Sequence, residues 1–88
     1  MRNAEKEKVF KALGDRNRLA VIDLIKENEL SAGQILAEIK MGQSTLSHHM
    51  KILCDSGIVN SRKDSRWVYY SINNEMIEEL KEVLESWK

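Results

Sequence analysis

The sequence predicts a mainly α fold with a small β component, in which four helices are followed by a β-hairpin and a fifth helix. Apolar residues recur at helical spacing over residues 5–55. After Gly57 the period changes, and β-branched and aromatic residues flank a polar stretch. From Asn74 the helical spacing returns. A composition of 42% hydrophobic and 32% charged residues without proline is typical of a folded, helix-rich domain.

The first two helices are expected at residues 5–13 and 16–27. Gly14 offers a stop for the first helix, and Asp15 is a suitable N-cap for the second. The second segment is dense in apolar residues, so we expect a largely buried helix. These residues are Leu19, Ala20, Ile22, Leu24 and Ile25.

A pair of short helices follows. Ser31 and Gln34 have the spacing of a capping box at the start of the third helix. Gly42 interrupts the pattern, and apolar residues then recur at i, i+4 and i+7 over residues 43–55, until Gly57 closes the fourth helix. Two helices joined by a short turn that contains glycine form a helix-turn-helix.

The segment after Gly57 predicts a hairpin. Ile58 and Val59 on one side and residues 67–72 on the other flank a charged tip at residues 60–66. A helix-turn-helix followed by a basic hairpin, or wing, places one helix in the major groove of DNA while the hairpin contacts the flanking backbone. The sequence therefore predicts a winged helix-turn-helix.

The charge distribution supports a nucleic-acid partner although the net charge is zero. Residues 40–72 hold five basic and two acidic side chains, whereas residues 73–88 hold two basic and five acidic ones. The helix-turn-helix end of the chain is therefore basic, and the terminal helix is acidic.

The fourth helix has an outer face that suits base edges. With about 100° of rotation per residue, Leu46 and Met50 point inward and His49 lies at the rim, while the neutral polar side chains point outward. Such groups donate and accept hydrogen bonds without burying a charge in the groove. The candidate DNA-binding residues are Gln43, Ser44, Thr45, Ser47, His48 and Lys51 on this helix and Arg62, Lys63 and Arg66 at the hairpin tip. An ordinary solvated helix face and a solvated turn remain the alternatives.

Three strings in order, FKALGDRNRL, QSTLSHHMKIL and SGIVNSRKDSRWVYYSI, resemble the ArsR/SmtB family of bacterial winged-helix repressors. The resemblance spans about residues 9–80. It implies a sequence-specific repressor that binds an inverted-repeat operator as a homodimer. The helix at residues 43–55 would lie in the major groove, and the wing at residues 60–67 would lie on flanking backbone or minor groove.

The resemblance also implies dimerisation through the first and last helices. A short chain buries a small core, so a partner subunit is expected on physical grounds as well. The apolar residues available for this interface are Val9, Phe10, Leu13, Met76, Ile77, Leu80, Val83, Leu84 and Trp87. The alternative is that the terminal helix packs on the first helix of the same chain.

The metal-binding residues of many relatives are missing. Where those relatives have Cys-Val-Cys at the start of the third helix, this chain has Ser31-Ala32-Gly33, and Asn74 and Met76 stand in place of an Asp-x-His motif. The side chains of the two adjacent histidines diverge by about 100° on a helix, so with the single cysteine they cannot assemble a three- or four-ligand site within a subunit. We therefore expect no metal and no cofactor, as in the metal-free, autorepressor-like subset of the family. Cys54 is expected to be a small apolar filler, with oxidation as the alternative.

The remaining expectations concern the whole chain. Residues 1–88 are expected to form one domain for DNA binding and dimerisation. No signal peptide or membrane span fits the sequence. A lone cysteine agrees with a reducing compartment, so a cytoplasmic location is expected. It has no catalytic constellation, so we expect no enzyme. An interaction module that binds protein without reading DNA sequence is the competing hypothesis, and an unidentified protein or small-molecule effector is left open.

Overall fold

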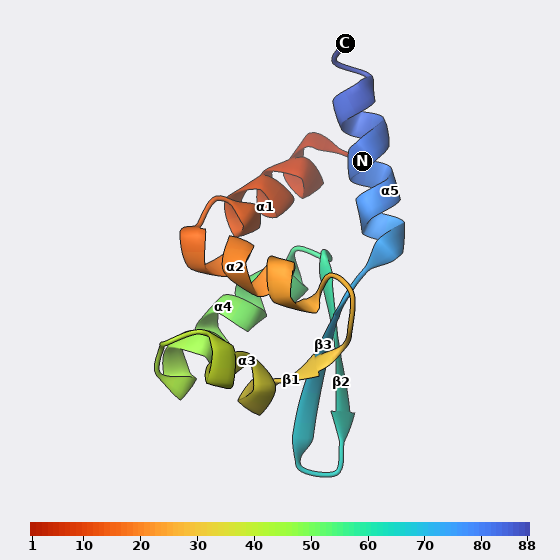
Figure 1. Ribbon diagram of the computed structural model, residues 1–88. Helices are drawn as coiled ribbons and strands as arrows, with labels where there is room; N and C mark the ends of the chain where they lie inside the picture. The colour runs from red at the N-terminus through yellow and green to blue at the C-terminus, as the bar shows by residue number, and fades with distance from the viewer.

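The computed structural model describes residues 1–88 and contains five helices and one three-stranded sheet (Figure 1). The elements are α1 (Asn3–Leu13), α2 (Arg16–Ile25), β1 (Leu30–Ser31), α3 (Ala32–Glu38), α4 (Gln43–Asp55), β2 (Val59–Asp64), β3 (Trp67–Ile72) and α5 (Asn74–Glu85). This order confirms the predicted helices, hairpin and terminal helix, and it adds the short strand β1.

Local hydrogen bonds fix the helix starts that the sequence predicts. The Asp15 carboxylate accepts from the backbone N–H groups of Asn17 and Arg18 at 2.8 and 3.1 Å. Ser31 and Gln34 form the expected capping box, with bonds of 2.8 and 3.2 Å.

The N-cap of α5 is Asn73, one residue before the point at which the helical spacing returns. The Asn73 carboxamide oxygen accepts from the Met76 N–H at 3.3 Å, while its nitrogen donates to the Gly57 carbonyl at 2.8 Å. Two adjacent asparagines are equivalent as local capping signals, so the contact with Gly57 decides which of them caps the helix.

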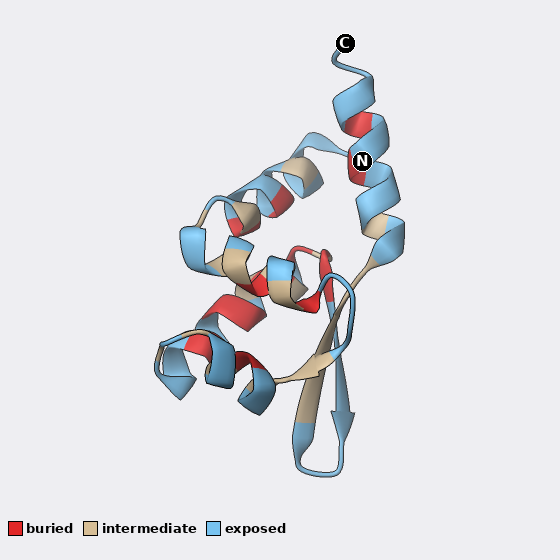
Figure 2. Ribbon diagram, in the orientation of Figure 1, coloured by how far each residue is buried: buried red, intermediate tan, exposed pale blue.

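A single hydrophobic core joins α1, α2, α3, α4, the start of β2 and, through Leu80, α5 (Figure 2). Its buried residues are Val9, Ala12, Val21, Ile25, Ile35, Leu46, Met50, Leu53, Ile58, Val59 and Leu80. The expectation of a largely buried α2 is wrong: only Val21 and Ile25 are buried on it, and Leu19 is exposed. The domain is too small to cover a helix on every side.

The sheet has the order β1-β3-β2, with both pairs antiparallel. β2 pairs with β3 from Val59↔Ile72 to Asp64↔Trp67, so the turn is only Ser65-Arg66, and Ser65 has φ 58°. The predicted tip at residues 60–66 is therefore too long. Polar residues of β2 are exposed on both faces, so backbone pairing forms the strand without an alternating apolar pattern.

The wing and α5 lie at opposite ends of the molecule (Figure 1). The chain turns from α4 into β2 at Gly57, which has φ +89° and a left-handed backbone. A Cβ there would lie 2.9 Å from the methyl carbon of Met76, but this is the flexible end of a side chain, so the positive φ is the main reason for glycine.

No helix of the structure is both long enough and apolar enough to cross a membrane.

Candidate nucleic-acid interface

Helix α4 separates an apolar inner face from a polar outer face. Leu46, Met50 and Leu53 are buried, as their spacing predicts. The exposed residues include all six candidates of this helix: Gln43, Ser44, Thr45, Ser47, His48 and Lys51. The N-cap is Gly42, which supplies no side-chain hydrogen bond to the first-turn amides. These N–H groups are therefore free to bind an external acceptor.

The two adjacent histidines have different environments. His48 is exposed, whereas His49 is buried, and its Nδ1 lies 3.1 Å from Nη1 of Arg18. Arg18 also donates from Nε to the Ala12 carbonyl at 2.6 Å and from Nη2 to the Lys11 carbonyl at 3.3 Å. The guanidinium of Arg18 therefore connects α4 to the end of α1. Sequence reasoning missed this residue, because its position in α2 gives no sign of its partner in α4.

The positive charge of α4 is partly neutralised on its own helix. The Lys51 ammonium lies 3.2 Å from the Asp55 carboxylate, one turn away, and both groups are exposed. Exposed pairs of this kind are weak, so the ammonium remains available to a phosphate.

The three basic residues of the wing are not equivalent. Arg62 on β2 donates to both carboxylate oxygens of Glu29, at 2.7 and 3.2 Å, and also lies 3.6 Å from Asp64. Its guanidinium is 4.6 Å from the centre of the Tyr69 ring. The hydrogen bonds from Arg62 hold the pKa of Glu29 below its usual value.

Lys63 and Arg66, by contrast, form no ion pair within the chain. Arg66 lies over the ring of Trp67 at 5.3 Å from its centre, and both side chains are exposed at the end of the hairpin. The three wing cations could not be told apart from the sequence. In the structure Arg62 is bound to carboxylates, whereas Lys63 and Arg66 form no ion pair.

The nine residues expected at a dimer interface fall into three groups. Val9, Leu80 and Val83 are buried within the protomer. Leu13 and Met76 are half-buried. The exposed members are Phe10 at 38%, Ile77 at 38%, Leu84 at 49% and Trp87 at 63%.

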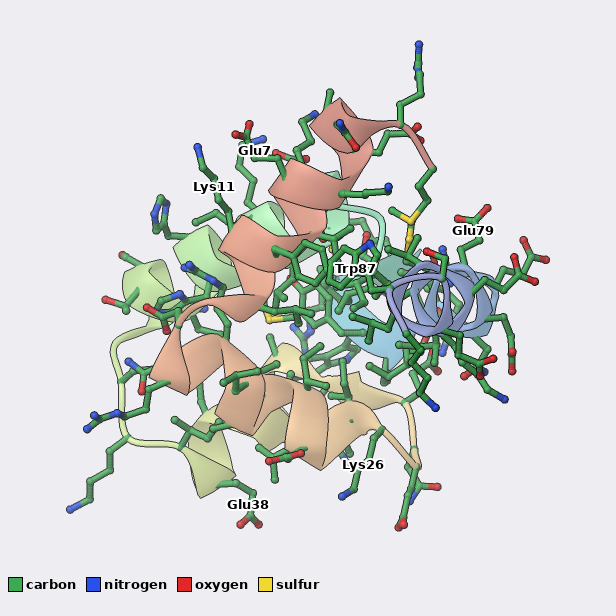
Figure 3. The ribbon with its side chains drawn as sticks, turned by 90° about the horizontal axis from the view of Figure 1, so that it is seen from above. Glu7, Lys11, Lys26, Glu38, Glu79 and Trp87 are labelled. Atoms are coloured by element: carbon green, nitrogen blue, oxygen red, sulfur yellow. The ribbon has the colours of Figure 1, made fainter.

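Helix α5 carries an apolar face that the protomer leaves open. The rings of Phe10 and Trp87 are 6.0 Å apart, and Figure 3 shows Trp87 between α1 and α5. Ile77 and Leu84 lie seven residues apart, so they share one side of α5, and Trp87 follows two residues after the end of this helix. The chain after α5 therefore contacts α1 at Trp87, yet much of this apolar surface still faces solvent.

The last two observations concern metal ligands and the single cysteine. No set of three or more His, Cys, Asp or Glu side chains is placed to hold a metal ion. Cys54 is half-buried, and burial raises the pKa of its thiol.

The helix-turn-helix, the polar outer face of α4 and the basic wing define a winged helix-turn-helix DNA-binding protein. Residues 15–61 match the model of bacterial regulatory proteins of the arsR family, and the chain belongs to this family. It is a DNA-binding transcriptional regulator.

Related proteins are similar to this chain over most of its length. It is 40% identical over 73 residues to an HTH-type transcriptional regulator of Methanocaldococcus jannaschii, covering 82% of both chains. It is 38% identical to the arsenical resistance operon repressor of Staphylococcus aureus, covering 82% of this chain and 69% of the relative. Among solved structures, HlyU from Vibrio cholerae is similar with a TM-score of 0.79 and 29% identity, covering 99% of this chain and 97% of that one.

Proposed function

We propose that the protein is a repressor that binds an inverted-repeat operator as a homodimer. Helix α4 lies in the major groove, and the wing lies on flanking backbone or in the minor groove. The observation that carries this proposal is the division of α4 into a buried apolar face and an exposed face of neutral polar side chains, beside a wing with two free cations.

The outer face of α4 supports direct readout of bases. Gln43, Ser44, Ser47 and His48 present amide, hydroxyl and imidazole groups that match the donors and acceptors of base edges. Thr45 and the free first-turn amides are suited to a phosphate contact. Lys51, Lys63 and Arg66 add electrostatic affinity that is independent of sequence.

The open apolar surface at the other end supports the dimer. Phe10, Ile77, Leu84 and Trp87 are large apolar residues that one protomer leaves exposed. A two-fold interface through α1 and α5 buries them against the same residues of a second copy. It also leaves both wings and both α4 helices free for two half-sites. We place the protein in the cytoplasm and assign it no catalytic activity.

Selection of binding sites from a random duplex library tests the proposal. We expect enrichment of an inverted repeat with half-sites about 10 base pairs apart, or a multiple of this spacing, to match the two-fold axis. Affinity for the selected duplex, measured by fluorescence anisotropy, should fall steeply with salt because bound cations displace counterions from DNA. No enrichment together with no binding at low salt would favour the protein-interaction module instead.

A further inference from the structure

A cleft separates the outer face of α4 from the wing. It has a volume of about 280 Å³ and is walled by the start of α3, the start of α4 and the start of β3. Its lining residues are Ala32, Gly33, Leu36, Gln43, Leu46, Ser47, Arg66, Trp67, Val68 and Tyr70. The one charged residue among them is Arg66, and no carboxylate lines the cleft.

Trp67 is the unexplained residue of this cleft. It is the first residue of β3 and is 51% exposed, although an indole is among the most favourable side chains to bury. The apolar surface of α1 and α5 lies at the opposite end of the molecule, so a dimer formed there leaves Trp67 uncovered (Figure 1). The neighbouring Arg66 guanidinium places a positive charge beside the exposed indole.

The geometry of B-DNA predicts which part of a bound duplex would lie between α4 and the wing. The major and minor grooves are separated by a single sugar-phosphate strand. If α4 enters the major groove and the wing approaches the adjacent minor groove, that strand runs between α4 and the wing. The cleft is continuous with the outer face of α4, because Gln43 and Ser47 belong to that face and also line the cleft.

The chemistry of the cleft walls matches such a strand. Arg66 supplies the cation for a phosphate. Trp67 supplies an apolar surface for the carbon-rich face of a deoxyribose, and Gln43 and Ser47 on the opposite wall supply neutral hydrogen-bonding groups.

We propose that this cleft seats one sugar-phosphate strand of the operator, with Trp67 packed against a deoxyribose and Arg66 paired with the adjacent phosphate. This inference rests on the proposed function, because it requires α4 to lie in the major groove. It assigns Trp67 a direct role in DNA affinity that does not depend on charge or on base sequence.

Salt dependence separates the roles of Trp67 and Arg66. Anisotropy with the selected duplex should show that Trp67→Ala weakens binding about tenfold, from lost apolar burial, without changing the slope of log affinity against log salt. Arg66→Ala should lower that slope by about one. Trp67→Phe should bind more tightly than Trp67→Ala and more weakly than the wild type, because the smaller ring retains part of the apolar surface. Trp67→Ala should weaken binding equally to the selected duplex and to an unrelated duplex.

Gly33 provides a second test at the other wall of the cleft. A Cβ at Gly33 lies 3.9 Å from the Ser31 hydroxyl, an ordinary van der Waals contact, and Gly33 is exposed, so a side chain at this position is compatible with the fold at its Cβ. We expect Gly33→Gln to weaken DNA binding by occupying the cleft, whereas the matched Gly33→Ala should bind as the wild type does. Thermal unfolding of each variant verifies that it is folded.

Tryptophan emission provides a readout that does not depend on affinity. Emission from the wild type should change when operator DNA is added, because Trp67 becomes shielded from water. Trp67→Phe should remove most of that change, since the second tryptophan, Trp87, lies at the other end of the molecule.

Failure of this inference differs from failure of the proposed function. Wild-type protein that binds DNA with a steep salt dependence, while Trp67→Ala and Gly33→Gln bind equally well, would overturn the cleft assignment alone. Wild-type protein that binds no DNA at low salt would overturn both.

Discussion

The Nη1 atom of Arg18 lies 3.1 Å from Nδ1 of His49 in the interior of the helical domain. Because the guanidinium has no acceptor, a hydrogen bond between these two atoms requires Nδ1 of His49 to accept. The same guanidinium donates to the carbonyls of Lys11 and Ala12 at the end of α1. One side chain therefore sets the position of α4 relative to the helix proposed to form the dimer.

Removal of this side chain should destabilise the fold. Arg18→Ala leaves the His49 nitrogen and the Ala12 carbonyl without their donor, and we expect a loss of roughly 1–3 kcal/mol in the free energy of unfolding. Urea denaturation measures this loss. The matched control is Arg16→Ala, because Arg16 is exposed, and its change should stay within about 0.5 kcal/mol. Equal stability of the two variants would show that the Arg18 hydrogen bonds contribute nothing.

Truncations on the outer face of α4 should change sequence preference and leave the fold intact. His48→Ala and Ser44→Ala each remove an exposed group that we propose reads a base edge, so discrimination at one base pair should fall by about 1–3 kcal/mol. Competition between the selected duplex and single-base variants measures the effect. Lys63→Ala is the comparison, because loss of a phosphate contact should weaken binding to all duplexes alike. Unaltered specificity in both α4 variants would contradict the assignment of these readers.

Release of Arg62 from its carboxylate should strengthen DNA binding. In Glu29→Gln the bidentate pair with Arg62 is lost, and the only carboxylate left beside Arg62 is the exposed Asp64 at 3.6 Å, so the guanidinium becomes more available to phosphate. We expect higher affinity and a steeper salt dependence, by up to about one unit of slope. Glu27→Gln makes the same charge change two residues earlier, and Glu27 has no bond to Arg62. An equal gain in both variants would attribute the effect to net charge alone.

A charge on the open side of α5 should separate the dimer. Leu84 is the better position for this test than Leu80, because Leu80 is buried in the protomer core and its replacement also threatens the fold. We expect Leu84→Lys to sediment as a monomer and to lose operator affinity. Glu82→Lys places the same side chain on an exposed site well away from Leu84 around α5 and should remain a dimer. A dimeric Leu84→Lys would exclude this interface.

The thiol of Cys54 should react slowly. Burial raises its pKa above the ordinary value, so the reactive thiolate is scarcer at a given pH than in a free cysteine. Mass spectrometry after timed exposure to iodoacetamide near pH 8 should show slower alkylation than that of a small free thiol, and denaturant should remove the difference. Alkylation of the folded protein at the rate of a free thiol would instead favour a redox role for Cys54.

Features held by local hydrogen bonds could be predicted from the sequence. The Ser31–Gln34 capping box, the Asp15 cap and the Gly57 helix stop each depend on residues within a few positions of one another. The inner face of α4 follows from the spacing of Leu46, Met50 and Leu53 for the same reason. Strand β1 was missed, because two residues show no period and the strand exists only by pairing with Tyr69 and Tyr70.

The sequence by itself determined the class of fold, the amphipathic character of the helix proposed to face DNA and the basic character of the wing. The tertiary structure decided which of these residues are free to act. Arg18 meets His49 across 31 positions, and Arg62 meets Glu29 across 33, so neither pair leaves a local signal. Burial likewise removes Val9 and Leu80 from the open surface and leaves Leu84 and Trp87 on it. Periodicity identifies the apolar face of a helix, but only packing against the rest of the chain determines how much of that face remains exposed.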